Sequence, residues 1–218
     1  MRPPPCSTMP QRPPGLDIHP PRQLFVHSTV GMPEDQDASL ISRCRRGDRD
    51  ALGALVDRYE KPVFNAAYRM LGNRAEASDV TQNVFLKVFE HLDGYESKFR
   101  FFSWIYRIAL NESIDQLQRR QRLELPGGDE FIDEQAASTT AGPEDMVDAS
   151  QLHDFVQAAL MELQEDYRAV IVLRHFADCS YEQMAEILHV PEKTIKSRLY
   201  SARQVMKEKL SARGIQPT

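Results

Sequence analysis

The chain is poor in cysteine. Its 218 residues contain three, Cys6, Cys44 and Cys179, which lie far apart and include no CxxC pair. An odd number at wide spacing argues against a disulfide framework and a zinc site, and it is typical of a reducing compartment. We therefore expect no metal and no cofactor, and we interpret Cys44 and Cys179 as ordinary thiols of core or surface.

Long apolar runs and catalytic motifs are also absent. No segment approaches the roughly 18 apolar residues of a spanning helix, and the N-terminus lacks the apolar core of a secretion signal. This predicts a cytoplasmic protein without direct membrane insertion. There is no paired nucleophile and base, no phosphate-cradling glycine loop and no metal spacing, and the six histidines are scattered. We expect the protein not to be an enzyme.

Strand-like alternation with hairpin turns is missing, and helical periodicity takes its place. Leu52, Leu55, Val56 and Tyr59 recur at the i, i+3, i+4, i+7 spacing of one buried helix face. The sequence predicts an all-α protein of two small helical domains joined by a flexible acidic linker. The expected parts are a disordered proline-rich leader (1–37), a first domain (38–122), the linker (123–150), a second domain (151–213) and a tail (214–218).

Composition sets the leader and the linker apart from the helical domains. The leader holds nine of the fourteen prolines, and Met32 lies just before order is expected, so residues 1–31 are either a flexible tail or an untranslated stretch. The linker holds eight acidic residues and no Lys or Arg. Since the whole chain has a formal net charge of −5 and the linker has one of −8, the rest of the chain has a net charge of +3.

Local signals predict where the helices of the first domain end and begin. Pro62 should kink its helix or mark a boundary within it. Gly72 suits a C-terminal cap. Asn73, with Glu76 three residues on, predicts the box-like cap of a new helix, and a further helix should start near Phe101.

A helix-turn-helix is predicted from Ser180 to Leu210. Ser180 is placed to cap the first helix and Gln183 to return the bond. His189 stands at the turn, and Pro191 suits the first turn of the second helix, where its missing N–H costs nothing.

The second of these helices has an outward basic face. Ile195 and Leu199 should point to the core, and from Lys193 to Arg213 seven basic residues stand against one acid. Such a helix fits a DNA major groove and attracts phosphates. The alternative is an ordinary helical hairpin with a solvated basic face.

Aromatic and basic residues crowd together between Tyr95 and Asn111. Rings beside basic groups are typical of single-stranded DNA binding, because stacking tolerates any base. The alternative is that the rings are simply core, which we favour for Phe102, Trp104 and Ile105. For the loop 94–100 we expect exposure and function.

Three motifs in this order, "DVTQNVFLKVF", "FFSWIYRIALN" and "TIKSRL", make the chain resemble the extracytoplasmic-function (ECF) sigma factors of the sigma-70 family. The first domain resembles the family's region 2 and the second its region 4, with no domain between them. The resemblance implies a sigma factor that binds core RNA polymerase, directs it to specific promoters and promotes promoter melting and transcription initiation.

The resemblance also implies site residues and partners. Core polymerase binding falls on Asp79, Gln82, Asn83 and Leu86. Contacts to the −10 element fall on Gly94, Tyr95, Glu96, Ser97, Lys98, Phe99, Arg100, Arg107 and Asn111. Contacts to the −35 element fall on Glu192, Lys193, Thr194, Lys196, Ser197, Arg198, Tyr200 and Arg203. The implied partners are the β′ clamp helices and β flap of core RNA polymerase, promoter DNA and an anti-sigma factor.

Three positions depart from the family pattern. Ser201 stands where many members have arginine, and His189 and Lys193 replace common glycines, so we expect an individual −35 preference. A helix-turn-helix regulator that binds DNA without polymerase is the main rival. It would leave the aromatic segment and the "DVTQNVF" helix without a role, and it would bind duplex promoter tightly on its own.

Overall fold

The computed structural model describes residues 34–96, 100–123 and 144–215. Across these ranges the regular elements are α-helices and one short 3-10 helix, so the predicted all-α fold is confirmed. The elements are α1 (Glu34–Arg45), α2 (Arg49–Leu71), α3 (Arg74–His91), η1 (Leu92–Gly94), α4 (Phe101–Leu123), α5 (Glu144–Met161), α6 (Glu165–His175), α7 (Tyr181–Leu188) and α8 (Glu192–Ser211). Predictions for 1–33, 97–99, 124–143 and 216–218 lie outside the described residues.

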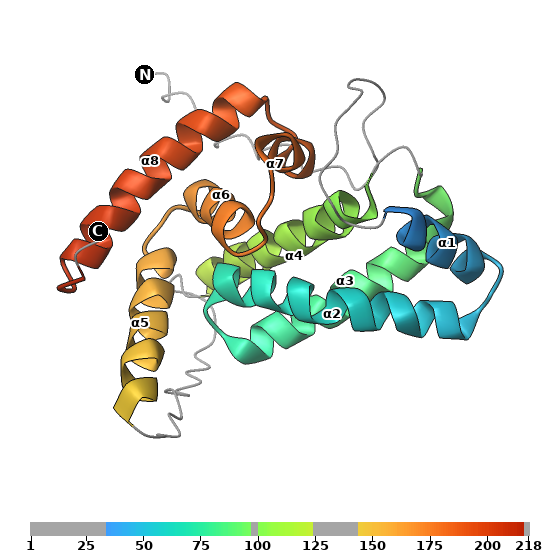
Figure 1. Cartoon of the computed structure of the whole chain (residues 1–218), viewed down its shortest axis with the longest axis horizontal. Coiled ribbons are helices and arrows are strands. Elements are labelled where there is room, and N and C mark those ends of the chain that lie inside the picture. The colour runs from blue at the N-terminus through green and yellow to red at the C-terminus, as the bar shows by residue number, and fades with distance from the viewer. Residues whose placement is uncertain (1–33, 97–99, 124–143, 216–218) are drawn as a thin grey trace, which may run out of the picture.

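Helices α1 to α4 form the first domain. In Figure 1, α2, α3 and α4 lie together in one bundle, with α1 at one end of it. Side chains such as Leu55, Val63, Met70, Val84 and Ile105 are fully enclosed between them. The buried faces follow the 3.6-residue period, because each helix must turn its apolar stripe toward its neighbours.

Capping residues set the bounds of α2 and α3. The Asp48 side chain accepts from the backbone N–H groups of Asp50 and Ala51 and so caps α2. Gly72 ends α2 at φ 76°, a left-handed conformation that favours glycine, and Asn73 caps α3. The predicted caps at Gly72 and Asn73 are confirmed. The Glu76 carboxylate, however, lies 3.5 Å from Arg120 of α4 and joins the two helices.

Pro62 lies inside α2, which continues on both sides of it. The prediction of a boundary there is wrong. Proline removes one backbone donor from a helix. The turns around Pro62 are nevertheless packed against α3 and α4, with Tyr59, Val63 and Ala66 buried, and this packing outweighs the local preference.

Helices α5 to α8 form the second domain. Its core contains Leu160, Leu173, Ile187, Ile195 and Leu199, so the two predicted core positions of the recognition helix are confirmed. Figure 1 shows α8 along the outside of α5 and α6, and α7 near the start of α4.

Two predicted boundaries differ from the structure. Helix α1 already begins at Glu34, inside the predicted leader, and Asp37 is held by Arg58 and the hydroxyl of Tyr59. Helix α5 begins at Glu144, inside the predicted linker, so residues 144–150 are helical.

Candidate nucleic-acid interface

The start of the helix-turn-helix is fixed by a reciprocal cap. The Ser180 hydroxyl accepts from the backbone N–H of Gln183 at 3.1 Å, and the Gln183 side chain accepts from the backbone N–H of Ser180 at 2.8 Å. This is the predicted capping box. It fixes where α7 begins and therefore how α7 presents α8.

The turn between α7 and α8 uses an uncommon backbone conformation. His189 has φ 53° and ψ 40°, and its backbone N–H reaches the carbonyl of Ala185. A left-handed residue closes a helix while reversing the chain, and histidine tolerates it better than most non-glycine residues. Pro191 is the N-cap residue, immediately before the first turn of α8.

The outward face of α8 carries most of the predicted −35 residues. Glu192, Lys193, Lys196, Ser197, Tyr200 and Arg203 are exposed, and Thr194 is half-buried. Tyr200 is a large hydrophobic side chain that is nevertheless 68% exposed. Ile195, Leu199 and Ala202 are buried on the opposite face of α8, and their packing sets the direction in which the exposed side chains point.

Two of the basic groups at this face are engaged within the second domain. Lys196 lies 3.1 Å from Glu192 and 5.5 Å above the ring of Tyr181, both exposed contacts that DNA can replace. Arg198 is half-buried and lies 2.9 Å from Asp166 of α6. Arg198 therefore lies at the edge of the outward face of α8, where Asp166 orients it. The spacing of residues in the sequence did not indicate this partner.

The basic residues at the C-terminal end of α8 and just after it form ion pairs with Glu162, the residue that follows α5. Lys209 lies 2.7 Å from Glu162, and Arg213 pairs with the same carboxylate. Hydrogen bonds from these two cations hold the pKa of Glu162 below its ordinary value. Lys209 and Arg213 are therefore engaged within the second domain, whereas Lys193, Lys196, Arg203 and Lys207 of the predicted basic stretch are exposed.

In the first domain, Arg45 of α1 holds the start of the predicted −10 loop. Its guanidinium donates to the carbonyls of Leu92 at 2.8 Å, Asp93 at 3.3 Å and Tyr95. A planar group with five donors can hold several carbonyls at once. Sequence analysis missed Arg45, since nothing local marks it and its partners lie 47 to 50 residues away.

The predicted exposure of loop 94–100 holds only in part. Tyr95 is 7% exposed, and its ring packs against Phe101 at 5.6 Å and Trp104 at 5.2 Å. The prediction of an exposed Tyr95 is therefore wrong, because the aromatic core of the bundle extends under the loop. Gly94 and Glu96 are exposed, and Arg100 is half-buried. Ser97, Lys98 and Phe99 lie outside the described residues.

Of the three residues predicted to lie in the core, Trp104 and Ile105 are confirmed, and Phe102 is only partly buried. Trp104 is 4% exposed and Ile105 is fully buried, while Phe102 is half-buried and packs 4.3 Å from Tyr106. These rings support the helix rather than lying open to solvent.

Arg107 and Asn111 lie one turn apart on α4, and α7 contacts the first of them. Arg107 is 3% exposed, and its Nη2 donates to the carbonyl of Glu186 at 2.6 Å. Burial lowers the pKa of Arg107, an effect that the nearby Glu186 carboxylate opposes. The buried Nε of Arg107 and Nδ2 of Asn111 have no hydrogen-bond partner among the described residues. In this conformation the Arg107 side chain is closed to DNA, whereas Asn111 is half-buried.

The four predicted polymerase-binding residues form one exposed strip on α3. Asp79, Gln82 and Asn83 are exposed, and Leu86 is 59% exposed. Beside Gln82, an open hollow of ≈ 250 Å³ lies between α2 and α3, lined by Glu60, Lys61, Phe64, Ser78 and Thr81. An exposed leucine within a polar helix edge is suited to a partner helix.

The residues that the structure describes contain neither a membrane-spanning helix nor a metal-binding cluster. No helix among them is long and apolar enough to cross a membrane. Within the same ranges, no group of three or more His, Cys, Asp or Glu side chains is arranged to hold a metal ion.

The two domains match two known sequence families. Sigma-70 region 2 matches residues 55–123, and Sigma-70, region 4 matches residues 156–206.

Curated relatives match across both domains. The ECF RNA polymerase sigma factor SigW of Bacillus subtilis strain 168 is 31% identical over 182 residues, covering 78% of this chain and 94% of the relative. The ECF RNA polymerase sigma-E factor of Escherichia coli strain K12 is 29% identical over 180 residues, covering 80% and 94%.

Solved structures are similar in fold as well. CnrH, solved with the cytosolic domain of CnrY, superposes with a TM-score of 0.61 at 25% identity, covering 82% of this chain and 99% of that chain. The sigma factor RpoE of Bartonella quintana, solved with the anti-sigma factor NepR, gives a TM-score of 0.59 at 27% identity, covering 73% and 96%.

Proposed function

The chain belongs to the sigma-70 family, in its ECF class, and from that premise we propose how its two domains divide the work of promoter recognition. As a sigma factor it binds core RNA polymerase, directs it to specific promoters and promotes melting and initiation. It is an initiation factor and not an enzyme. One observation supports this division. The exposed basic residues at the start of α8 lie on the second domain, and the exposed strip of α3 lies on the first.

The second domain reads the −35 element through the N-terminal half of α8. Lys193, Lys196, Ser197 and Tyr200 are exposed along one side of the helix that a major groove can accept. Arg203 extends the same side toward the phosphates, and Arg198 contributes from its edge. Phosphate contacts position the helix, while the side chains nearest its start select the bases.

The first domain holds the melted −10 strand. The loop that starts at Gly94 is fixed by Arg45, and an aromatic core lies directly beneath it. Capture of an unpaired nucleobase requires a rigid support beneath the loop and positively charged side chains around it. Asn111 is half-buried beside this surface, and Arg107 is held by the Glu186 carbonyl of α7.

Core polymerase binds along α3. The strip of Asp79, Gln82, Asn83 and Leu86 is the part of the first domain that offers an exposed leucine among polar groups. We assign it to the β′ clamp helices, with the second domain meeting the β flap. An anti-sigma partner is supported by both similar structures, because CnrH was solved with the cytosolic domain of CnrY and RpoE with the anti-sigma factor NepR. The place of action is the cytoplasm, where the polymerase works.

A run-off transcription assay tests the proposal. Core polymerase is mixed with the chain on a genomic promoter library, and Lys196→Ala is compared with Lys207→Ala, an exposed lysine farther along α8. We expect Lys196→Ala to weaken promoter binding by about 1–3 kcal/mol and to change the preferred −35 bases. The Lys207 variant should keep the preference.

Two results would contradict the assignment. Unchanged −35 preference in Lys196→Ala would show that α8 is not oriented as proposed. Absence of a promoter-dependent transcript with any variant, together with tight duplex binding by the chain alone, would favour the helix-turn-helix regulator.

A further inference from the structure

The turn between α1 and α2 is rich in arginine. Residues 43–50 hold four arginines against two acids, and the chain reverses its direction within them. Gly47 makes the reversal at φ 84°, with its backbone N–H on the carbonyl of Cys44 at 2.9 Å, and Asp48 then caps α2. The four arginine side chains therefore start from one tight turn of backbone.

Three of these arginines differ in how their charge is balanced. Arg43 lies 2.8 Å from Asp48, so its charge is met inside the turn. Arg46 donates to the neutral hydroxyl of Ser42 at 2.8 Å, and Arg49 is the first residue of α2. Both Arg46 and Arg49 are exposed, and neither forms an ion pair with another of the described residues. Two cations are therefore left to act on a partner.

The fourth arginine, Arg45, fixes this turn to the −10 loop. Its guanidinium donates to the carbonyls of Leu92, Asp93 and Tyr95. A planar group that holds several carbonyls sets the position of both segments that it joins. Arg46 is the next residue in the chain, so the turn and its exposed cations lie beside the start of the loop.

The described part of the loop does not itself offer much positive charge. Asp93 and Glu96 are exposed acids, Arg100 is a half-buried cation, and Lys98 lies outside the described residues. A single strand of DNA carries a negative phosphate at every nucleotide, and proteins meet that charge with lysine and arginine. The arginines of the neighbouring turn supply this charge from a different helix.

We propose that Arg46 and Arg49 form a phosphate-binding site for the melted promoter strand, held beside the −10 loop by Arg45. The partner is the sugar–phosphate backbone of single-stranded DNA, whatever its bases. Phosphate contacts position a strand and base contacts select it, so this site holds the strand while the loop captures a base. The inference rests on the proposed function, because the strand is the one that the loop receives.

Holoenzyme binding to tailed promoter probes tests the site. Core polymerase loaded with the full chain is titrated with a duplex that ends upstream of the −10 element, and with the same duplex bearing a single-stranded −10 tail. The ratio of the two Kd values is the affinity gained from the tail. In the double variant Arg46→Gln with Arg49→Gln, this gain should fall roughly tenfold at about 50 mM salt.

The salt dependence gives a second readout. Each phosphate contact to a single strand contributes about 0.7 to the slope of log affinity against log salt concentration. Loss of two contacts should lower that slope by about 1.4, so the tenfold deficit should shrink to about 1.4-fold at about 200 mM salt. A role confined to holding the loop in place would leave the deficit at both salt concentrations.

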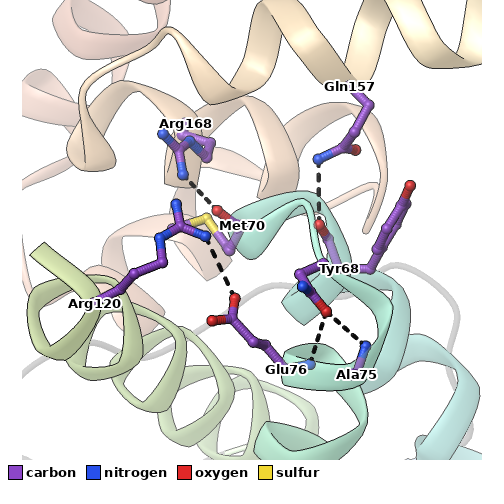
Figure 2. A network of polar contacts seen from close by, with 8 residues as sticks. Tyr68, Met70, Ala75, Glu76, Arg120, Gln157 and Arg168 are labelled. Carbon is purple, nitrogen blue, oxygen red and sulfur yellow. Dashed lines mark hydrogen bonds and ion pairs between the residues drawn. The ribbon is translucent and has the colours of Figure 1, made fainter. Parts of the chain in front are cut away.

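A charge-matched control lies at the other end of α3. The double variant Arg119→Gln with Arg122→Gln removes two exposed cations near the C-terminal end of α4. Arg120, between them, pairs with Glu76 in the first turn of α3, as Figure 2 shows. The −10 loop begins past the last turn of α3, about 24 Å away along the helix. Because the Debye length is about 10 Å at 0.1 M salt, the control should keep the gain from the tail.

Arg45→Gln separates positioning from backbone binding. Without the guanidinium the loop carbonyls lose their shared donor, so this variant should lose both the gain from the tail and the discrimination between a preferred and a substituted −10 base. The double variant of Arg46 and Arg49 should keep that discrimination, because phosphate contacts weaken binding about equally for all sequences.

The outcomes are distinguishable. An equal gain from the tail in the Arg46 and Arg49 double variant and in the control would overturn the site, provided that the unmodified holoenzyme binds the tail. Weaker binding of the double variant to core polymerase without DNA would assign the two arginines to the polymerase and would also overturn it. If circular dichroism shows lost helices, the single variants Arg46→Gln and Arg49→Gln decide by the same ratio. An unmodified holoenzyme that gains nothing from the tail would remove the proposed function of the first domain, and the site with it.

Discussion

Replacing Arg168 with methionine should destabilise the second domain strongly. Arg168 is 6% exposed, and its guanidinium donates to the carbonyls of Leu160 at 2.9 Å, Met161 at 2.8 Å and Leu163 at 3.0 Å, as well as to Met70 of the first domain. One side chain thus binds the backbone carbonyls at the C-terminal end of α5 and in the turn that leads to α6.

The magnitude follows from two opposing effects. Hydrogen bonds that involve a charged group contribute roughly 1.5–3 kcal/mol each, and methionine leaves the carbonyls without this donor. Burying the cation costs several kcal/mol, which methionine recovers. The lowered pKa of Arg168, caused mainly by its burial, is the sign of that cost. With three bonds lost inside the second domain, we expect a net loss of about 3 kcal/mol.

Urea unfolding followed by far-UV circular dichroism measures the loss. With a slope of about 2–3 kcal/mol per molar urea, the midpoint of the second domain should fall by about 1 M. Arg168→Lys should not rescue it, because an ammonium cannot reach the same set of carbonyls from one point. Arg119→Met, at an exposed position of α4, is the control. A loss below about 1 kcal/mol, the range of a surface ion pair, would refute the reasoning.

Three further predictions concern local features. Ser180→Ala should cost about 1 kcal/mol by removing the cap of α7, whereas Ser180→Asp should retain most of the stability in the same urea titration. Trp104→Ala should cost about 3–5 kcal/mol, because the ring is buried against Tyr95; a stable variant defective only in melting would contradict this, and circular dichroism with permanganate footprinting separates the two. Burial raises the pKa of the Cys179 thiol to about 12, so at pH 8 it should react with a thiol reagent far more slowly in the folded chain than in urea, and Cys179→Ser should remove that slow phase. Fast reaction of all thiols in the folded chain would show that Cys179 is accessible.

Local sequence alone determined several of the helix ends and the buried face of α8, but not the starts of α1 and α5. The caps at Gly72, Asn73 and Ser180 involve atoms within four residues of one another, and the core positions Ile195 and Leu199 follow from the helical period. Such features depend on short-range geometry, which is the same wherever the segment lies. The two-domain all-α architecture followed from them together with the family motifs.

Tertiary structure decided which of the functional side chains are open. Arg198 is drawn to Asp166, Tyr95 is buried under its own loop, Arg45 holds that loop from a distant helix, and Arg107 lies beneath α7. Each of these results depends on a partner 32 to 79 residues away or on the shape of a packed core, as the Arg198–Asp166 and Arg107–Glu186 contacts illustrate. Sequence spacing carries no information about such partners, because they become neighbours only when separate helices pack together.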